Sequence, residues 1–178
     1  MKNKILLVSV IALSGVVIGA ITTPESAFTR LSSLSRLIQQ FGVADTFAKL
    51  NGGGPGNYND DGEMIMRNAF NSIKTADGSS YIVCVKNSVI AVHQRQPSMV
   101  GKNINTTSLK GLHGAIVKKL GMNKGSILAV PFASGLGKVI DATTGKPLMQ
   151  SRRAYAAHSR YLLGKKNTGE KFYCAVID

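Results

Sequence analysis

Two short apolar segments, separated by a two-residue polar turn, constrain the fold of this chain more than any other feature. Residues 79–86 and 89–94 are rich in apolar and β-branched side chains, and Asn87 and Ser88 stand between them. Strand-like segments on either side of such a turn predict a β-hairpin. The hairpin needs further elements to pack against, because an isolated two-stranded ribbon is marginally stable at best.

The segments after this hairpin predict the rest of a small sheet. A helix is expected to begin at Thr107 or Ser108 and to end at Gly121. Three further strands are expected over residues 125–132, 152–161 and 171–177, and residues 134–150 are expected to form a long loop. Strands and helices do not alternate as they do in βαβ units. We therefore predict an α+β fold, with a five-stranded, mainly antiparallel sheet and helices packed on one face.

The residues before the hairpin predict helices joined by a connector. In residues 25–50 the apolar side chains recur with the i, i+3, i+4 spacing of an amphipathic helix, which Gly42 can interrupt. Residues 51–57 contain four glycines and a proline, which is typical of a flexible connector. Residues 60–73 predict a second helix that begins with a capping box.

The first 21 residues have the pattern of an export signal. Lys2 and Lys4 precede an apolar run over residues 5–21, and a basic start followed by an apolar core is typical of a secretory signal peptide. The run is slightly short for a membrane span, which needs about 20 residues, and Ala20 is small enough for a cleavage site. Residues 1–21 are thus expected to be a signal peptide or a membrane anchor, and the rest of the chain is expected to be periplasmic or extracellular. A cytosolic core helix is the alternative.

The two cysteines lie in strand-like segments at opposite ends of the predicted sheet region. Cys84 belongs to the first of these segments and Cys174 to the last. In an oxidising compartment two such residues can form a disulfide. They can equally be two small buried apolar side chains, and their spacing does not decide between these alternatives. Neither lies in a CxxC pattern, so no metal is expected there.

The basic residues are concentrated in the second part of the chain. The sequence has 22 Lys and Arg against 9 Asp and Glu, a formal net charge of +13. Residues 1–78 contain 7 basic and 6 acidic residues, whereas residues 79–178 contain 15 and 3. Such a surface attracts anions of many kinds, so an anionic partner is expected. The alternative is that the basic pI is an adaptation to solubility or to an anionic envelope.

The stretch after the second expected strand resembles the Cache family of extracytoplasmic small-molecule sensors. Ile90-Ala91-Val92-His93 is followed by Pro97-Ser98-Met99-Val100-Gly101-Lys102-Asn103, which is similar to the family's apolar strand, His, short gap and proline-led Gly-Lys-Asn segment. The fourth strand of the family often has a basic residue three positions before a tyrosine, as Arg152 and Tyr155 stand here. The resemblance covers residues 62–178, as a single Cache domain, and residues 22–61 match its leading helix and a Gly-rich connector.

This resemblance implies a PAS-like fold, with a small-molecule pocket between the sheet and the segments that connect its strands. It also implies that the first and last strands are central neighbours, so that Cys84 and Cys174 lie close enough to form a disulfide. The residues that it places near the pocket have cationic or hydrogen-bonding side chains: His93, Arg95, Lys102, Arg152 and Tyr155. Because Arg grips carboxylates bidentately, a small carboxylate or an amino acid is the expected ligand.

On this interpretation the chain is a ligand-binding, sensor-type domain and not an enzyme. No catalytic residue, metal site or cofactor is expected, since the histidines show no ligand spacing and no P-loop is present. The sequence contains no signalling region, so the domain would present a small anionic or zwitterionic ligand to a membrane receptor or an envelope partner. Nucleic acid is not an expected partner. The main alternative is a basic exported module that binds an anionic polymer, a lipid or a partner protein, and an enzyme is a further rival.

Overall fold

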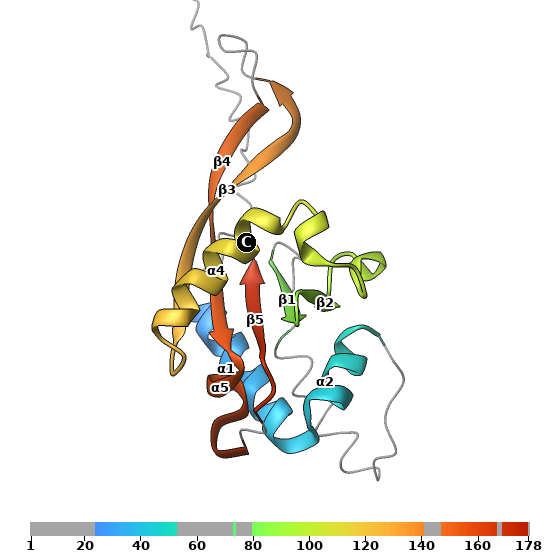
Figure 1. The fold of residues 1–178 in the computed structure, drawn as a ribbon, viewed down its shortest axis with the longest axis vertical. Coiled ribbons are helices and arrows are strands. Elements are labelled where there is room, and N and C mark those ends of the chain that lie inside the picture. The colour runs from blue at the N-terminus through green and yellow to red at the C-terminus, as the bar shows by residue number, and fades with distance from the viewer. Residues whose placement is uncertain (1–23, 53–72, 74–79, 141–146, 167–168, 178) are drawn as a thin grey trace, which may run out of the picture.

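The computed structural model describes residues 24–52, 73, 80–140, 147–166 and 169–177 (Figure 1). The expected export signal over residues 1–21 lies outside these ranges. The second predicted helix, apart from Ile73, and most of the connector before it lie outside them as well. No helix in the described ranges is both long and apolar enough to cross a membrane.

An antiparallel sheet of five strands forms the centre of the fold. The strands are β1 (Tyr81–Lys86), β2 (Val89–His93), β3 (Ile127–Ile140), β4 (Pro147–His158) and β5 (Phe172–Ile177). Their order across the sheet is β2-β1-β5-β4-β3, and each neighbouring pair is antiparallel. The α+β class and the five-stranded antiparallel sheet are thereby confirmed, and the first and last strands are neighbours at the sheet centre.

The turn between β1 and β2 falls at the two residues that the sequence indicated. Asn87 and Ser88 have φ angles of 52° and 61°, both in the left-handed region. A two-residue type I′ turn needs positive φ at both central positions, and its twist matches that of the flanking strands. The hairpin is therefore specified locally, by residues next to each other in the chain.

The predicted long loop over residues 134–150 is wrong. β3 continues to Ile140 and β4 begins at Pro147, so the two strands form one long hairpin that projects beyond the rest of the sheet (Figure 1). The glycines of this stretch favoured a loop, but ladder hydrogen bonds come from the backbone and do not need a side chain. The fourth strand also ends earlier than predicted, at His158, where the short helix α5 (Ser159–Leu163) begins.

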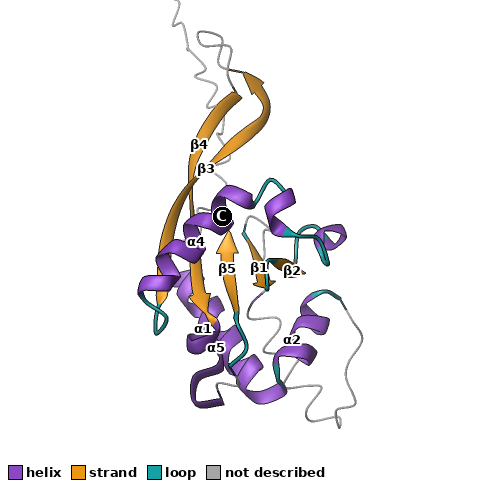
Figure 2. Ribbon diagram, viewed as in Figure 1, coloured by secondary structure: helices purple, strands orange, loops and turns teal. Residues whose placement is uncertain are grey.

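Helices cover both faces of the sheet, which corrects the expectation of helices on a single face. The N-terminal helices α1 (Pro24–Phe41) and α2 (Val43–Leu50) do share one face, with α5, and Gly42 separates them with a φ of 87°. Helix α4 (Lys110–Met122) packs on the other face. In Figures 1 and 2 it crosses in front of the strands, whereas α1 lies behind them. The turns η1 (Pro97–Met99) and η2 (Ile104–Thr106) lead from β2 to α4.

Strand β5 shows why both faces are covered. Phe172, Cys174 and Val176 belong to the core beneath α1, which also contains Leu31, Leu34 and Ile38. The alternate residues Tyr173, Ala175 and Ile177 belong to the core beneath α4, with Ile116 and Leu120. All six residues of the strand are buried. A strand that is apolar at every position is typical of burial on both faces.

A disulfide joins β1 to β5 at the sheet centre. Cys84 and Cys174 stand directly opposite each other in the ladder, with an S–S distance of 2.07 Å and a Cα–Cα distance of 4.0 Å. Both residues are fully buried in the core beneath α1. Of the two alternatives that the sequence left open, the structure therefore has the bonded one.

Candidate functional site

Three of the five residues selected from the sequence lie together at one end of the sheet. His93 stacks on the ring of Tyr81, and the guanidinium carbon of Arg95 lies 5.8 Å from the centre of that ring. Arg152 is close enough for its charge to act on the Tyr81 hydroxyl. The group lies on the α4 face, and Tyr81, which links its members, was not selected from the sequence.

The other two selected residues lie elsewhere. Lys102 is exposed beside the beginning of β2, where its carbonyl accepts a hydrogen bond of 2.9 Å from the backbone N–H of Ile90. Tyr155 is 3% exposed and lies on the α1 face, with its ring centre 6.2 Å from that of Phe28. Tyr155 therefore faces away from Arg152, and the two side chains do not line one pocket.

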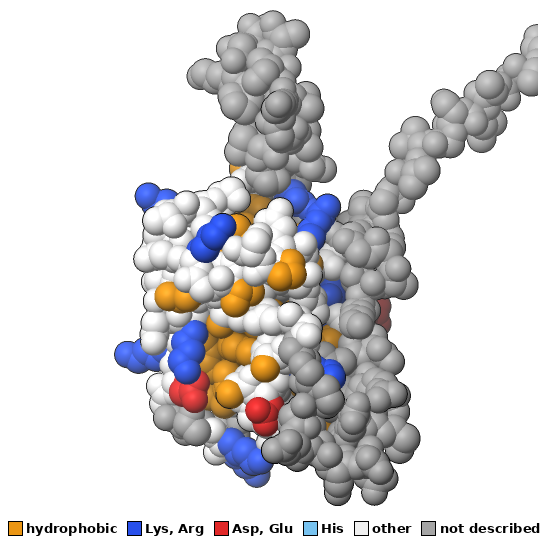
Figure 3. All heavy atoms as spheres, turned by 90° about the vertical axis from the view of Figure 1, so that its right-hand side faces the viewer, with side chains coloured by type: hydrophobic (Ala, Val, Ile, Leu, Met, Phe, Trp, Pro, Cys, Tyr) orange, Lys and Arg blue, Asp and Glu red, His pale blue; other side chains and the backbone are white. Residues whose placement is uncertain are grey.

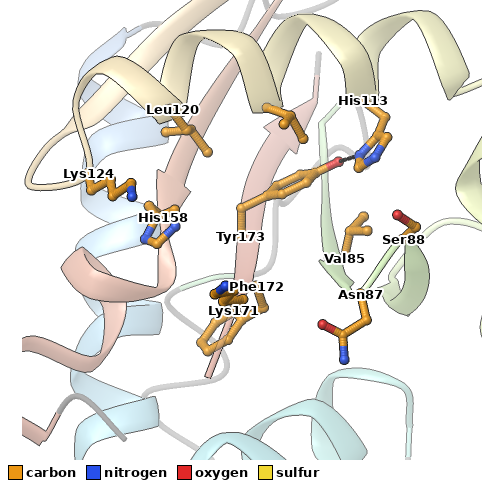
Figure 4. Close-up of a pocket in the computed structure, with 12 residues that line it drawn as sticks. Val85, Asn87, Ser88, His113, Leu120, Lys124, His158, Lys171, Phe172 and Tyr173 are labelled. Carbon is orange, nitrogen blue, oxygen red and sulfur yellow. Dashed lines mark hydrogen bonds between the residues drawn. The ribbon is translucent and has the colours of Figure 1, made fainter. Parts of the chain in front are cut away.

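A cavity of about 310 Å³ lies between α4 and the sheet, at the end of β1 that leads into the hairpin turn (Figure 4). Its apolar wall comes from both layers, with Val117 and Leu120 on α4 and Val85 on β1. Gly121 also lines it, and a Cβ atom at this position would meet no other atom within 4 Å. The cavity volume is at the lower end of the range of small-molecule sites.

One hydrogen-bonded pair bridges the two layers beside this cavity. A ring nitrogen of His113 on α4, Nδ1, lies 2.9 Å from the hydroxyl oxygen of Tyr173 on β5, and the two rings are stacked with their centres 5.8 Å apart. Burial lowers the pKa of His113 and raises the pKa of Tyr173 well above its ordinary value of 10.0. Both side chains are therefore uncharged at neutral pH, and they supply polar but neutral wall atoms.

His158 places a hydrogen-bond donor beside a cation. Its Nδ1 accepts a hydrogen bond of 3.0 Å from the backbone N–H of Arg160 and thereby caps α5. Burial lowers the pKa of His158, and the positive charges of Lys124 and Arg160 lower it further. The ring is thus neutral, and because Nδ1 is an acceptor its hydrogen is on Nε2. Figure 4 shows the end of the Lys124 side chain next to this ring.

The rim of the cavity carries an excess of positive charge. Lys124 and Lys171 line it, and none of the described lining residues is Asp or Glu. Glu170, which precedes Lys171, is bound instead to Lys86 at 2.8 Å. In the described part of the chain, neither Lys124 nor Lys171 forms an ion pair. The arrangement can therefore attract an anion and can bury an apolar group beside it.

No motif in the sequence identifies the residues of this cavity. A partial signal exists, since His113, Val117 and Gly121 follow the spacing of one side of a helix, and Lys124 follows the end of that helix by two residues. The three histidines of the sequence, His93, His113 and His158, show no ligand spacing. Only the tertiary structure brings His158 and Lys171 from the other end of the chain to that side of α4.

The comparisons with known proteins add no assignment. No family model matches this chain, and neither a curated protein nor a solved structure is significantly similar to it. Among the described residues, no three His, Cys, Asp or Glu side chains are grouped so that they could hold a metal ion.

Proposed function

We propose that this chain is an exported, sensor-type binding domain whose cavity between α4 and the sheet takes a small organic carboxylate. One observation carries the proposal: a cavity of about 310 Å³ combines an apolar wall with neutral hydrogen-bonding groups and two cations that have no described carboxylate partner. Its volume is at the lower end of the range of small-molecule sites, which suits a small metabolite.

The chemistry of the wall defines the ligand class. A carboxylate at the rim can accept hydrogen bonds from the Lys124 ammonium and from the Nε2–H of His158, and bonds to charged groups contribute about 1.5–3 kcal/mol each. An aliphatic or aromatic group then packs against Val117, Leu120 and Val85 on the α4 side of the sheet. The carbonyl and hydroxyl oxygens of Asn87 and Ser88 can accept from the ammonium of an amino acid. A simple amine is disfavoured, because no acidic side chain is among the described lining residues.

The fold supports a sensor-type domain of the PAS-like, Cache kind. The first and last strands are central neighbours in the order β2-β1-β5-β4-β3, and a leading helix, α1, packs on one face. The cavity lies under α4, in the segment that connects β2 to β3. The strand order and the leading helix match what the resemblance of residues 62–178 implies, and we propose that family on these two features. None of the five residues that the resemblance places near a pocket lines this cavity.

The disulfide supports export. A bond between two fully buried cysteines on central strands is a structural bond, and such bonds persist in oxidising compartments rather than in the cytosol. The pattern of residues 1–21 favours the same location. We accordingly propose a periplasmic or extracellular domain that presents its ligand to a membrane receptor or an envelope partner.

The charge distribution favours a second candidate, a basic module that binds an anionic polymer or lipid. Residues 79–178 contain 15 basic and 3 acidic residues. On the face shown in Figure 3, Lys and Arg side chains stand at several places around exposed hydrophobic groups. Strong, salt-dependent retention on heparin, without stabilisation by any small carboxylate, would favour this candidate over the first.

A thermal-shift screen of the full chain tests the first candidate. The probes are benzoate, phenylacetate, isovalerate, pyruvate and leucine, with benzylamine as a probe that is not expected to bind. A ligand at 100 times its Kd stabilises the folded state by about 2.7 kcal/mol, which is a measurable shift. The proposal expects at least one carboxylate to stabilise the chain, and stabilisation by benzylamine alone would contradict it.

Charge variants then locate the binding. Lys124→Gln and Lys171→Gln are each expected to weaken carboxylate binding about 3- to 10-fold, because each removes one partly solvated charge. Lys118→Gln is the matched control, since it removes the same charge from an exposed position of α4 that does not line the cavity. Equal weakening by all three variants would show that general charge, and not the cavity, attracts the ligand.

A further inference from the structure

A second cationic cluster lies on the α4 face at the opposite end of β1. It consists of Tyr81, His93, Arg95 and Arg152, and none of these residues lines the cavity. Tyr81 is the first residue of β1, whereas the cavity begins at Val85, so about 13 Å of strand separates the two places. The cluster is therefore a distinct feature with its own chemistry.

The aromatic part of this cluster is held rigidly. The rings of Tyr81 and His93 are stacked with centres 5.1 Å apart and planes inclined by 24°. His93 is 3% exposed, and its Nδ1 accepts a hydrogen bond of 2.9 Å from the backbone N–H of Gln96. The neighbouring Gln94 donates its N–H to the carbonyl of Ile82, and its side-chain oxygen accepts from the N–H of the same residue. The backbone on both sides of Arg95 is thus held in place, by Ile82 of β1 on the side of Gln94 and by His93 of β2 on the side of Gln96.

The guanidinium of Arg95 lies against the rigidly held ring of Tyr81. Its guanidinium carbon lies 5.8 Å from the centre of the Tyr81 ring, within the range of a cation–π contact. Its side chain is exposed at the same time. A guanidinium that is already oriented by an aromatic ring loses less freedom when it binds an anion.

The register of the sheet brings Arg152 to the same place. Tyr81 pairs with Ile177, and Ile177 pairs with Ala154, so the three residues form a row across β1, β5 and β4. Arg152 is two positions before Ala154 and so lies on the same face of β4. Neighbouring strands are about 4.8 Å apart, so the long side chain of Arg152 can reach toward Tyr81.

The electrostatics of the cluster favour an anion. Burial raises the pKa of the Tyr81 hydroxyl above its ordinary 10.0, and the nearby charges of Arg152 and Arg95 oppose this shift only in part. Burial lowers the pKa of His93, so that ring is neutral at pH 7. Two guanidinium charges and one hydroxyl donor thus lie together. In the described part of the chain no carboxylate pairs with either guanidinium, and Asp141 and Asp178 lie outside that part.

We infer that Tyr81, Arg95 and Arg152 form a binding site for a phosphate-type dianion. Each guanidinium donates N–H groups to the oxygens of the anion, and the hydroxyl of Tyr81 donates a further hydrogen bond. A dianion is favoured over a monocarboxylate because the positive charges of Arg95 and Arg152 both act on Tyr81, and its tetrahedral oxygens accept from several directions. The phosphate group can belong to a free phosphomonoester or can be carried by a polymer.

Calorimetric titration of the full chain with inorganic phosphate at low ionic strength tests the site. Arg152→Gln is expected to weaken phosphate binding at least 5-fold, and Tyr81→Phe, which removes only the hydroxyl, about 2- to 5-fold. Arg153→Gln is the matched control: it makes the same charge change one residue away, at an exposed side chain on the opposite face of β4. It is expected to leave the affinity within 2-fold of the wild type.

Three results would overturn the inference: no phosphate binding by the folded wild type, equal weakening by Arg152→Gln and Arg153→Gln, or loss of binding in Lys124→Gln. The last result would move the phosphate to the cavity, so the two proposals can fail separately. Circular dichroism of each variant checks the fold. Titration with glucose 6-phosphate and with polyphosphate, compared per phosphate group, then distinguishes a free monoester from a polymer-borne group as the source.

Discussion

Removal of the disulfide between Cys84 and Cys174 should lower the free energy of unfolding by about 4.6 kcal/mol. The bond joins residues 90 positions apart, and the chain entropy that such a loop removes from the unfolded state corresponds to about 4.6 kcal/mol at 25 °C. For a chain of this size each kcal/mol lowers Tm by about 2–4 °C, so Tm should fall by roughly 9–18 °C. Because both residues are fully buried, truncation to Ala adds a smaller loss of packing.

Urea unfolding of Cys84→Ala, Cys174→Ala and the double variant measures this effect. Tyrosine fluorescence can follow the transition, since the chain has five Tyr and no Trp. Each single variant breaks the same bond, so the three variants should differ from one another by no more than about 1–2 kcal/mol. The reasoning is refuted if the double variant loses less than about 1 kcal/mol, or if its loss equals the sum of the two single losses, because packing alone would then explain it.

Tyr155→Phe should leave the binding of carboxylates and phosphate unchanged, while Tyr155→Ala should cost about 3–5 kcal/mol in urea unfolding, because the ring is buried beneath α1. Weakened binding in Tyr155→Phe would instead show that the Tyr155 hydroxyl takes part in ligand binding. Stability should fall as the pH is lowered from 7.5 to 5. Burial lowers the pKa of His93, His113 and His158 in the folded chain. The unfolded chain therefore takes up protons first as the pH falls. The stability that the three neutral rings contribute is fully present above their unfolded pKa of about 6.5 and is lost as the pH falls toward their folded pKa values. A urea midpoint that stays constant or rises as the pH is lowered from 7.5 to 5 would contradict this predicted loss of stability. Ser88→Gly should raise the free energy of unfolding by up to about 1 kcal/mol, because Ser88 has a φ of 61° in a type I′ turn, and an unchanged urea midpoint would argue against strain at this turn.

The parts of the fold that depend on neighbouring residues could be predicted from the sequence. The turn at Asn87 and Ser88 needs positive φ at two adjacent positions, and the break at Gly42 needs one left-handed residue. The length of the β3–β4 hairpin depends instead on backbone pairing between strands that contain several glycines. Side-chain patterns carry little information about such pairing, so the stretch was predicted to be a loop.

In the candidate sites, too, features set by neighbouring residues could be predicted and features set by tertiary packing could not. Arg152 and Tyr155 are three positions apart, and in a strand this spacing places two side chains on opposite faces. That geometry was available from the sequence once residues 152–161 were predicted to be a strand, yet the family resemblance grouped the two residues. The cavity could not be predicted in this way, because Lys124, His158 and Lys171 meet only through the packing of α4 on β4 and β5.

The most direct test of the proposed function is to block the cavity with a side chain. Gly121 lines the cavity and Gly114 does not, although both are exposed on α4 and a Cβ atom at either would meet nothing within 4 Å. Leucine at either position should therefore fold equally well and gain similar helix propensity. Calorimetric titration with the carboxylate that gives the largest thermal shift should show at least 10-fold weaker binding to Gly121→Leu and unchanged binding to Gly114→Leu. Equal affinity in both variants and the wild type would contradict the account, because the carboxylate would then bind outside this cavity.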